Sequence, residues 1–189
     1  MNKEQQLSIL HRIILDAGVT KAAPVEQKDI LYDRVFRDIC ASNSCGNYGM
    51  CHMCPPDIGD IDALMQEAQS YSCGILYQTI SEIEDSFDFE GMIEAGKHHN
   101  DCSQKIRISL EKEGFTNILH LASGGCRVCE RCAKRDQQPC RFPDQALSSL
   151  EAYGVNVYQT ATNAGLKYIN GANTVTYFGI VMIKEDQNA

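Results

Sequence analysis

Four cysteines in the second half of the chain are spaced like the ligands of an iron–sulfur cluster: Cys126, Cys129, Cys132 and Cys140. Two residues between neighbouring cysteines allow their sulfur atoms to converge on one compact group, and the more distant Cys140 can close the site. Proteins hold a [4Fe–4S] cluster in this way, with several thiolates from one short run. In bacterial ferredoxins the last cysteine follows sooner and directly precedes a proline, whereas here Pro143 stands three residues after Cys140.

The same four cysteines fit two other kinds of site. A structural zinc ion also takes thiolates with two residues between them, as a rule from two separated pairs. A run of three fits a cubane better, because one zinc ion seldom takes three ligands so close together in the chain. Disulfides or free thiols are the third interpretation.

A second group of four cysteines lies earlier in the chain: Cys40, Cys45, Cys51 and Cys54. Gly46 and Gly49 within the group, and Pro55-Pro56 after it, predict a loop that wraps around a bound group. The proline after Cys54 fixes the direction in which the chain leaves the site. Four thiolates suffice for a second cubane or for one zinc ion, and His52 could replace a cysteine as a zinc ligand. The identity of this metal centre stays open.

Basic residues crowd the later cysteine group, although the chain as a whole carries a net charge of −8 and has a pI near 5.1. They are Arg127, Arg131, Lys134, Arg135 and Arg141. Such cations would favour the more reduced state of a cluster and could receive an acidic redox partner protein; a solvated loop without a partner is the plainer interpretation. The overall acidity argues against nucleic acid as a partner. The oligomeric state stays open, and a homo-oligomer is one possibility.

The 189 residues, 43% of them hydrophobic, are enough for one domain with a real core. We expect an N-terminal helix and linker over residues 1–24 and an iron–sulfur (metal-binding) α/β domain over residues 25–189. The N-terminus is polar, and no apolar run approaches the roughly 18 residues of a membrane span, so neither a signal peptide nor a membrane contact is expected. This predicts a cytoplasmic protein, in which clustered cysteines act as metal ligands.

Periodicity predicts a single layered α/β domain, with a sheet of about four strands, helices packed on it and two cysteine-rich metal-binding loops. The expected helices cover residues 3–16, 61–71, 90–113, 145–153 and 161–168, and the expected strands cover residues 73–80, 115–121, 155–158 and 174–183. His99 and Cys102 lie on the inner stripe of one helix and Cys73 lies in a strand, so we expect all three in the core. The loop with Cys126 follows the carboxyl end of a strand, where α/β sheets place their sites.

Motifs from both cysteine groups together resemble one family of proteins. They are Cys40, Cys45-Gly46-Asn47-Tyr48-Gly49, Cys54-Pro55-Pro56, the run from Cys126 to Cys132, Cys140-Arg141-Phe142-Pro143 and Glu151-Ala152-Tyr153-Gly154-Val155. The chain resembles a family of predicted metal-binding proteins found mainly in anaerobic bacteria and archaea, and the resemblance covers most of its length. It implies that the position of Cys51 need not be a cysteine, which would leave three thiolates and one exposed iron.

We therefore expect an iron–sulfur protein of anaerobic metabolism, with one [4Fe–4S] cluster at the later cysteine group and a second centre at the earlier one. Electron transfer between partner proteins is the first functional hypothesis. The second is an enzyme that uses the open iron of a three-cysteine cluster as a Lewis acid, with Tyr48 and His52 as acid–base groups. The third is a structural zinc site in an interaction module. The sequence contains no phosphate-binding loop and no nucleotide-binding fingerprint.

Overall fold

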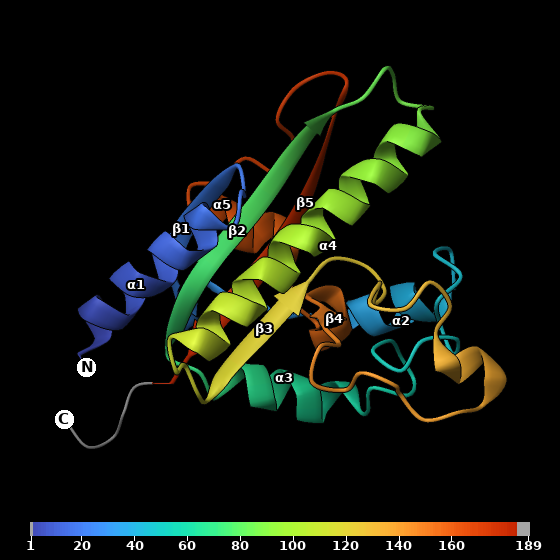
Figure 1. Ribbon diagram of the computed structural model, residues 1–189, viewed down its shortest axis with the longest axis horizontal. Coiled ribbons are helices and arrows are strands. Elements are labelled where there is room, and N and C mark those ends of the chain that lie inside the picture. The colour runs from blue at the N-terminus through green and yellow to red at the C-terminus, as the bar shows by residue number, and fades with distance from the viewer. Residues whose placement is uncertain (1, 185–189) are drawn as a thin grey trace.

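A five-stranded open sheet forms the centre of the molecule in the computed structural model, which describes residues 2–184 (Figure 1). The strands follow the order β1 (Lys21–Glu26), β2 (Cys73–Glu82), β5 (Thr174–Ile183), β3 (Ile118–Ala122) and β4 (Ser148–Ser149). β2 and β5 pair antiparallel over their whole length, from Cys73 opposite Ile183 to Glu82 opposite Thr174. Only the short β4 runs parallel to its neighbour β3. Two long central strands thus provide the rigid base of the fold.

Two helices cover one face of the sheet, α1 (Lys3–Asp16) and α4 (Phe89–Lys112). α1 begins at a capping box, in which Asn2 and Gln5 bond each other's backbone N–H groups. Side chains alternate along β2, so Ile75 and Tyr77 point to this face and pack with Leu10 and Ile106. Burying an aliphatic side chain of this size contributes about 1.5–3 kcal/mol, so this layer anchors the N-terminal helix firmly.

The opposite face carries α3 (Ile61–Gln69), α5 (Val157–Asn163) and the 3-10 turn η3 (Glu151–Tyr153). The Asp60 side chain accepts hydrogen bonds from the first N–H groups of α3 and so starts that helix. Leu64 and Ala68 of α3 pack with Leu76 and Ile180 from the central strands. The short helix α2 (Val35–Ala41) lies beyond this layer and leads into the earlier cysteine group.

The α/β class and the helices packed on the sheet are confirmed, whereas three local expectations are wrong. Ala22-Ala23-Pro24, expected as a linker, lies in β1. β1 is an edge strand, where a proline is tolerated because one side of the strand needs no partner. Residues 145–153 form β4 and η3 instead of a helix. The expected strand over residues 155–158 gives way to α5, because the Asn156 side chain accepts a hydrogen bond from the Gln159 N–H and caps a helix there.

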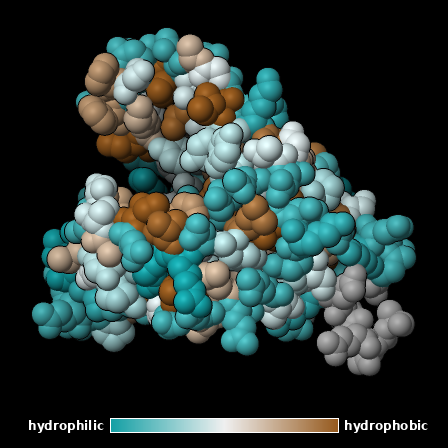
Figure 2. Space-filling model, turned by 180° about the vertical axis from the view of Figure 1, so that it is seen from behind, coloured by the Kyte–Doolittle hydropathy of each residue, from teal (hydrophilic) through white to brown (hydrophobic). Residues whose placement is uncertain are grey.

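The two cysteine-bearing segments lie beside each other at one end of the sheet. Residues 42–60 connect α2 to α3, and residues 123–147 connect β3 to β4 (Figure 1). Seen from behind, the surface is hollowed between this part and the tip formed by β2, α4 and β5 (Figure 2). None of the helices within residues 2–184 has the length and apolarity that crossing a membrane would require.

Candidate metal centre

The later cysteine segment leaves the sheet at the end of β3 and is bent by its glycines. Gly124 has a φ of 66°, a conformation that a residue with a side chain rarely adopts. After the cysteine run the chain forms the 3-10 turn η2 (Ala133–Asp136). The next residue, Gln137, has a left-handed backbone conformation with a φ of 56°. Residues 126–140 thus follow the carboxyl end of β3, as expected from the sequence.

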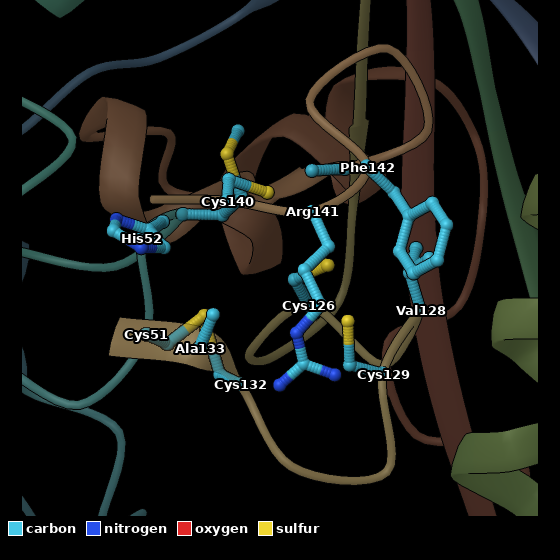
Figure 3. A pocket seen from close by; sticks show the side chains of 12 residues that line it. Cys51, His52, Cys126, Val128, Cys129, Cys132, Ala133, Cys140, Arg141 and Phe142 are labelled. Carbon is cyan, nitrogen blue, oxygen red and sulfur yellow. The ribbon is translucent and has the colours of Figure 1, made fainter. Parts of the chain in front are cut away.

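Five cysteine side chains line one pocket in this part of the molecule. They are Cys51, Cys126, Cys129, Cys132 and Cys140 (Figure 3). His52, Val128 and Phe142 complete much of the wall, and Arg141 crosses the view in front of the cysteines. All four cysteines of the later group therefore line the same pocket, and one cysteine of the earlier group joins them.

Cys51 is the most deeply buried of the five, with 2% of its surface exposed. Its thiolate accepts a hydrogen bond from the Cys54 thiol, which lowers the pKa of Cys51 to about 6. The N–H groups of Met53 and Cys126 and the Cys132 thiol support the same negative charge. Burial acts in the opposite direction. The pKa of Cys54 is raised in return, because its proton is held in this hydrogen bond. Cys51 is thus prepared to act as a thiolate, the form that binds metals.

The other three cysteines of the earlier group face a separate pocket of about 300 Å³, formed by Cys40, Cys45 and Cys54 together with Tyr48 and Glu151. Burial raises the pKa of Cys40, and the nearby Glu151 and Cys45 raise it further. Burial also raises the pKa of Glu151 itself. The cysteines are therefore arranged as five and three, not as the two groups of four that their order in the chain suggests.

The two pockets are neighbours. A third, outer cleft is lined by Cys45 from one set and by Cys126 and Cys129 from the other. Among residues 2–184, no three His, Cys, Asp or Glu side chains stand close enough together to hold a single metal ion. The cysteine side chains thus line the two pockets without converging on one point.

Contacts between the two segments fix the positions of these cysteines. The His52 Nε2 lies 2.8 Å from the Gln138 carbonyl oxygen, and the Ser148 hydroxyl donates to the Met53 carbonyl over 2.9 Å. Lys134 forms an ion pair with Asp57. Because these bonds join residues far apart in the chain, the later segment holds Cys51 and Cys54 in place.

The basic residues near the later cysteines are largely engaged within the molecule. Arg131 pairs with Asp136 over 2.7 Å, and Arg135 donates to the Gly46 carbonyl over 3.2 Å. Arg141 in turn donates to the Arg131 carbonyl over 3.1 Å. These side chains connect loops to one another, a role that a count of charges could not reveal.

Residues outside the cysteine groups divide between core and site. Cys73, His99 and Cys102 are buried, so the expectation that they belong to the core is confirmed. Glu151 and Ser149 line the pocket with Cys40, Cys45 and Cys54 but were not singled out for chemistry from the sequence. The sequence gives little indication of their role. Both residues lie in a stretch whose sequence pattern is helical, whereas the chain folds there as β4 and η3.

Comparison with protein families matches residues 23–183 to one family, DUF2284, which is described as a predicted metal-binding protein. The chain belongs to this family. The match spans both cysteine groups and the whole sheet apart from the first residues of β1. Neither the curated proteins nor the solved structures contain a match to the chain. Membership in DUF2284 supports metal binding and does not specify the metal.

Proposed function

We propose that this DUF2284 protein is an iron–sulfur protein that transfers electrons, with a [4Fe–4S] cluster in the five-cysteine pocket. The observation that carries the proposal is the convergence of five cysteine side chains, drawn from two distant segments, on one pocket. Thiolates are the ligands that iron–sulfur clusters take. The family description, metal binding, is consistent with this donor set.

The donor set favours a cluster over a single zinc ion. Five cysteine side chains from two segments line the pocket, whereas a structural zinc ion takes four donors at about 2.0–2.3 Å from one point. A cubane presents its four irons at separate corners, so its thiolates stand farther apart. The N–H groups that support the Cys51 thiolate would also stabilise a negatively charged cluster.

Four of the five cysteines suffice for a cubane, and Cys126, Cys129 and Cys132 supply the closely spaced three. The spacing of the later group predicts Cys140 as the fourth ligand. Burial and hydrogen bonding favour Cys51 instead, because a buried thiolate beside the cluster is far more stable as an iron ligand than as a free charge. We therefore assign Cys51 to this cluster and treat Cys140 as its neighbour.

The three remaining cysteines of the earlier group, Cys40, Cys45 and Cys54, would hold a second cluster. The outer cleft shared by Cys45, Cys126 and Cys129 keeps the two sites adjacent, so an electron could pass from one centre to the other within a single chain. A redox partner protein with an acidic surface would be attracted to the arginines that remain exposed around the later segment.

Anaerobic purification, with iron, acid-labile sulfide and zinc counted per chain, tests this function. We expect a brown protein with iron and sulfide in equal amounts and with a reversible one-electron reduction. Stoichiometric zinc without sulfide would contradict the proposal and support a structural zinc site in an interaction module.

A further inference from the structure

We infer that the pocket beside Cys40, Cys45 and Cys54 is a binding site for a small uncharged molecule with a sulfur or oxygen donor atom. This inference rests on the proposed function, because the donor atom would complete the coordination of the second cluster. The pocket volume of about 300 Å³ lies at the lower end of the range for small-molecule sites.

The number of cysteines that line each pocket leads to this assignment. Cys51 is the fourth cysteine of the earlier group by sequence, but its side chain lines the neighbouring pocket. Cys140, the other cysteine outside the closely spaced run, lines that neighbouring pocket as well. Three thiolates therefore remain for a cluster at the pocket lined by Cys40, Cys45 and Cys54, and the fourth position needs a donor from elsewhere. The pocket opens directly beside these three thiols.

The lining of the pocket defines the chemical class of the ligand. No lysine or arginine is among the described residues that line it, so the lining offers an anion no ion pair. Ile39 and Pro55 give apolar walls, while the Tyr48 hydroxyl and the Glu151 carboxyl can form hydrogen bonds with a polar group. This combination suits a small uncharged thiol or alcohol.

Two neighbouring serines provide a matched test. Ser42 and Ser44 are both exposed and their hydroxyls lie 3.0 Å apart, but only Ser44 lines the pocket. A tryptophan in place of Ser44 would fill the pocket without replacing a cysteine, whereas Ser42→Trp breaks the same serine–serine contact and leaves the pocket open. Comparable iron contents in the two variants would confirm that both still fold around their clusters.

The probe is 2-mercaptoethanol, added to the anaerobically purified and reduced full chain while its electron paramagnetic resonance spectrum is recorded. We expect the thiol to change the signal of one of the two clusters in the wild type and in Ser42→Trp. Ser44→Trp should need an at least tenfold higher concentration, equivalent to ~1.4 kcal/mol of binding free energy. Glu151→Gln, which keeps the shape of the carboxyl, should change the affinity without loss of iron.

Two results would overturn the inference and leave the proposed function standing. One is a protein with two clusters whose spectrum does not respond to the thiol. The other is an equal response in Ser42→Trp and Ser44→Trp. Absence of iron and sulfide from the purified chain would instead contradict the proposed function itself.

Discussion

Cys51 shows how strongly the surroundings of a single residue can differ from those its sequence neighbours suggest. It lies between Cys45 and Cys54 in the chain, yet it faces Cys132 and the backbone of Cys126. The hydrogen bond from the nearby Cys54 thiol does most to lower its pKa to about 6, and the N–H groups of Met53 and Cys126 and the Cys132 thiol lower the pKa further. The side-chain chemistry of Cys51 is therefore determined by its own segment together with the tertiary fold.

Substituting Cys51 and Cys140 one at a time tests which of them is a ligand of the proposed cluster. We expect Cys51→Ser to lose about half of the iron, because the five-cysteine pocket then lacks the buried thiolate. Cys140→Ser should retain nearly all of its iron. Iron per chain and the electron paramagnetic resonance spectrum of each variant provide the measurement. The reverse result would restore Cys140 as the fourth ligand, in agreement with the spacing of the later cysteine group.

At the scale of elements, one glycine controls how closely the two cysteine segments approach. A Cβ atom at Gly125 would lie 2.8 Å from the Cγ and Nδ2 atoms of Asn47. The Asn47 side chain is positioned by a hydrogen bond to the Cys45 carbonyl oxygen over 3.3 Å. A methyl group at position 125 would thus push the segments apart at the point where the two pockets adjoin.

We expect Gly125→Ala to lower the free energy of unfolding by ~1–3 kcal/mol through this overpacking. Adding Asn47→Ala removes the atoms that the new methyl group meets, so the double variant should recover much of the loss. Urea unfolding of both single variants and the double variant gives the coupling energy. Strictly additive effects would show that the contact between Asn47 and Gly125 does not limit the approach of the segments.

Polar contacts attach α4 to the sheet beneath the cysteine segments. The Tyr77 hydroxyl lies 2.8 Å from both the Ser103 hydroxyl and the His120 Nε2, and the Thr79 hydroxyl lies 2.9 Å from the His99 Nδ1. Burial lowers the pKa of His99 to about 4 and that of His120 to about 3. Both histidines therefore stay neutral in the folded protein at neutral pH.

This network predicts an acid-sensitive attachment of α4. An unfolded histidine has a pKa near 6.5, so the stabilisation is complete above pH ~6.5 and is lost as the pH falls from there toward 4. Each histidine contributes a slope of up to ~1.4 kcal/mol per pH unit in that interval. Urea unfolding between pH 7.5 and 5 should show a flatter pH dependence for His99→Gln and for His120→Gln.

His98→Gln is the control for this series, because His98 is exposed on the same helix. It should keep the wild-type slope. An unchanged slope in both buried-histidine variants would mean that other groups cause the acid sensitivity.

Much of the sheet and its long helices could be predicted, because their side chains repeat with the period of the element. The stripe with Leu10 and Ile14 predicts α1, and the apolar run from Cys73 to Ile80 predicts β2. β1 could not be predicted, since alanine and proline say little without the partner strand that supplies their hydrogen bonds. The division of the cysteines between the two pockets could not be predicted either. The spacing of cysteines in the chain specifies which of them can converge locally, but it does not specify which distant segment approaches them.

On the scale of the whole molecule, the hydrophobic core and the cysteine segments are separate. Two clusters of buried side chains lie on the two faces of the sheet. Residues 42–60 and 123–147 contribute few apolar side chains to either cluster. We infer that the sheet and its helices are stable without metal, whereas the two segments depend on it for their order.

Removal of iron by anaerobic chelation tests this division. We expect the circular dichroism of the helices and sheet to persist, while the melting temperature falls because metal binding stabilises the native state. Limited proteolysis of the metal-free protein should cut first within residues 42–60 and 123–147. The loaded protein serves as the control and should resist at these positions. Complete loss of secondary structure on chelation would show instead that the core requires the metal.

The placement of Cys51 also has a consequence for biogenesis. During translation the earlier cysteine segment leaves the ribosome well before Cys126 and its neighbours are made. The nascent chain therefore exposes the thiols of Cys40, Cys45 and Cys54 before either pocket is complete, because Ser149 and Glu151 of one pocket and Cys126, Cys129, Cys132 and Cys140 of the other are made later. Under the proposed function, neither cluster site would be complete before the later cysteine segment and η3 have been synthesised.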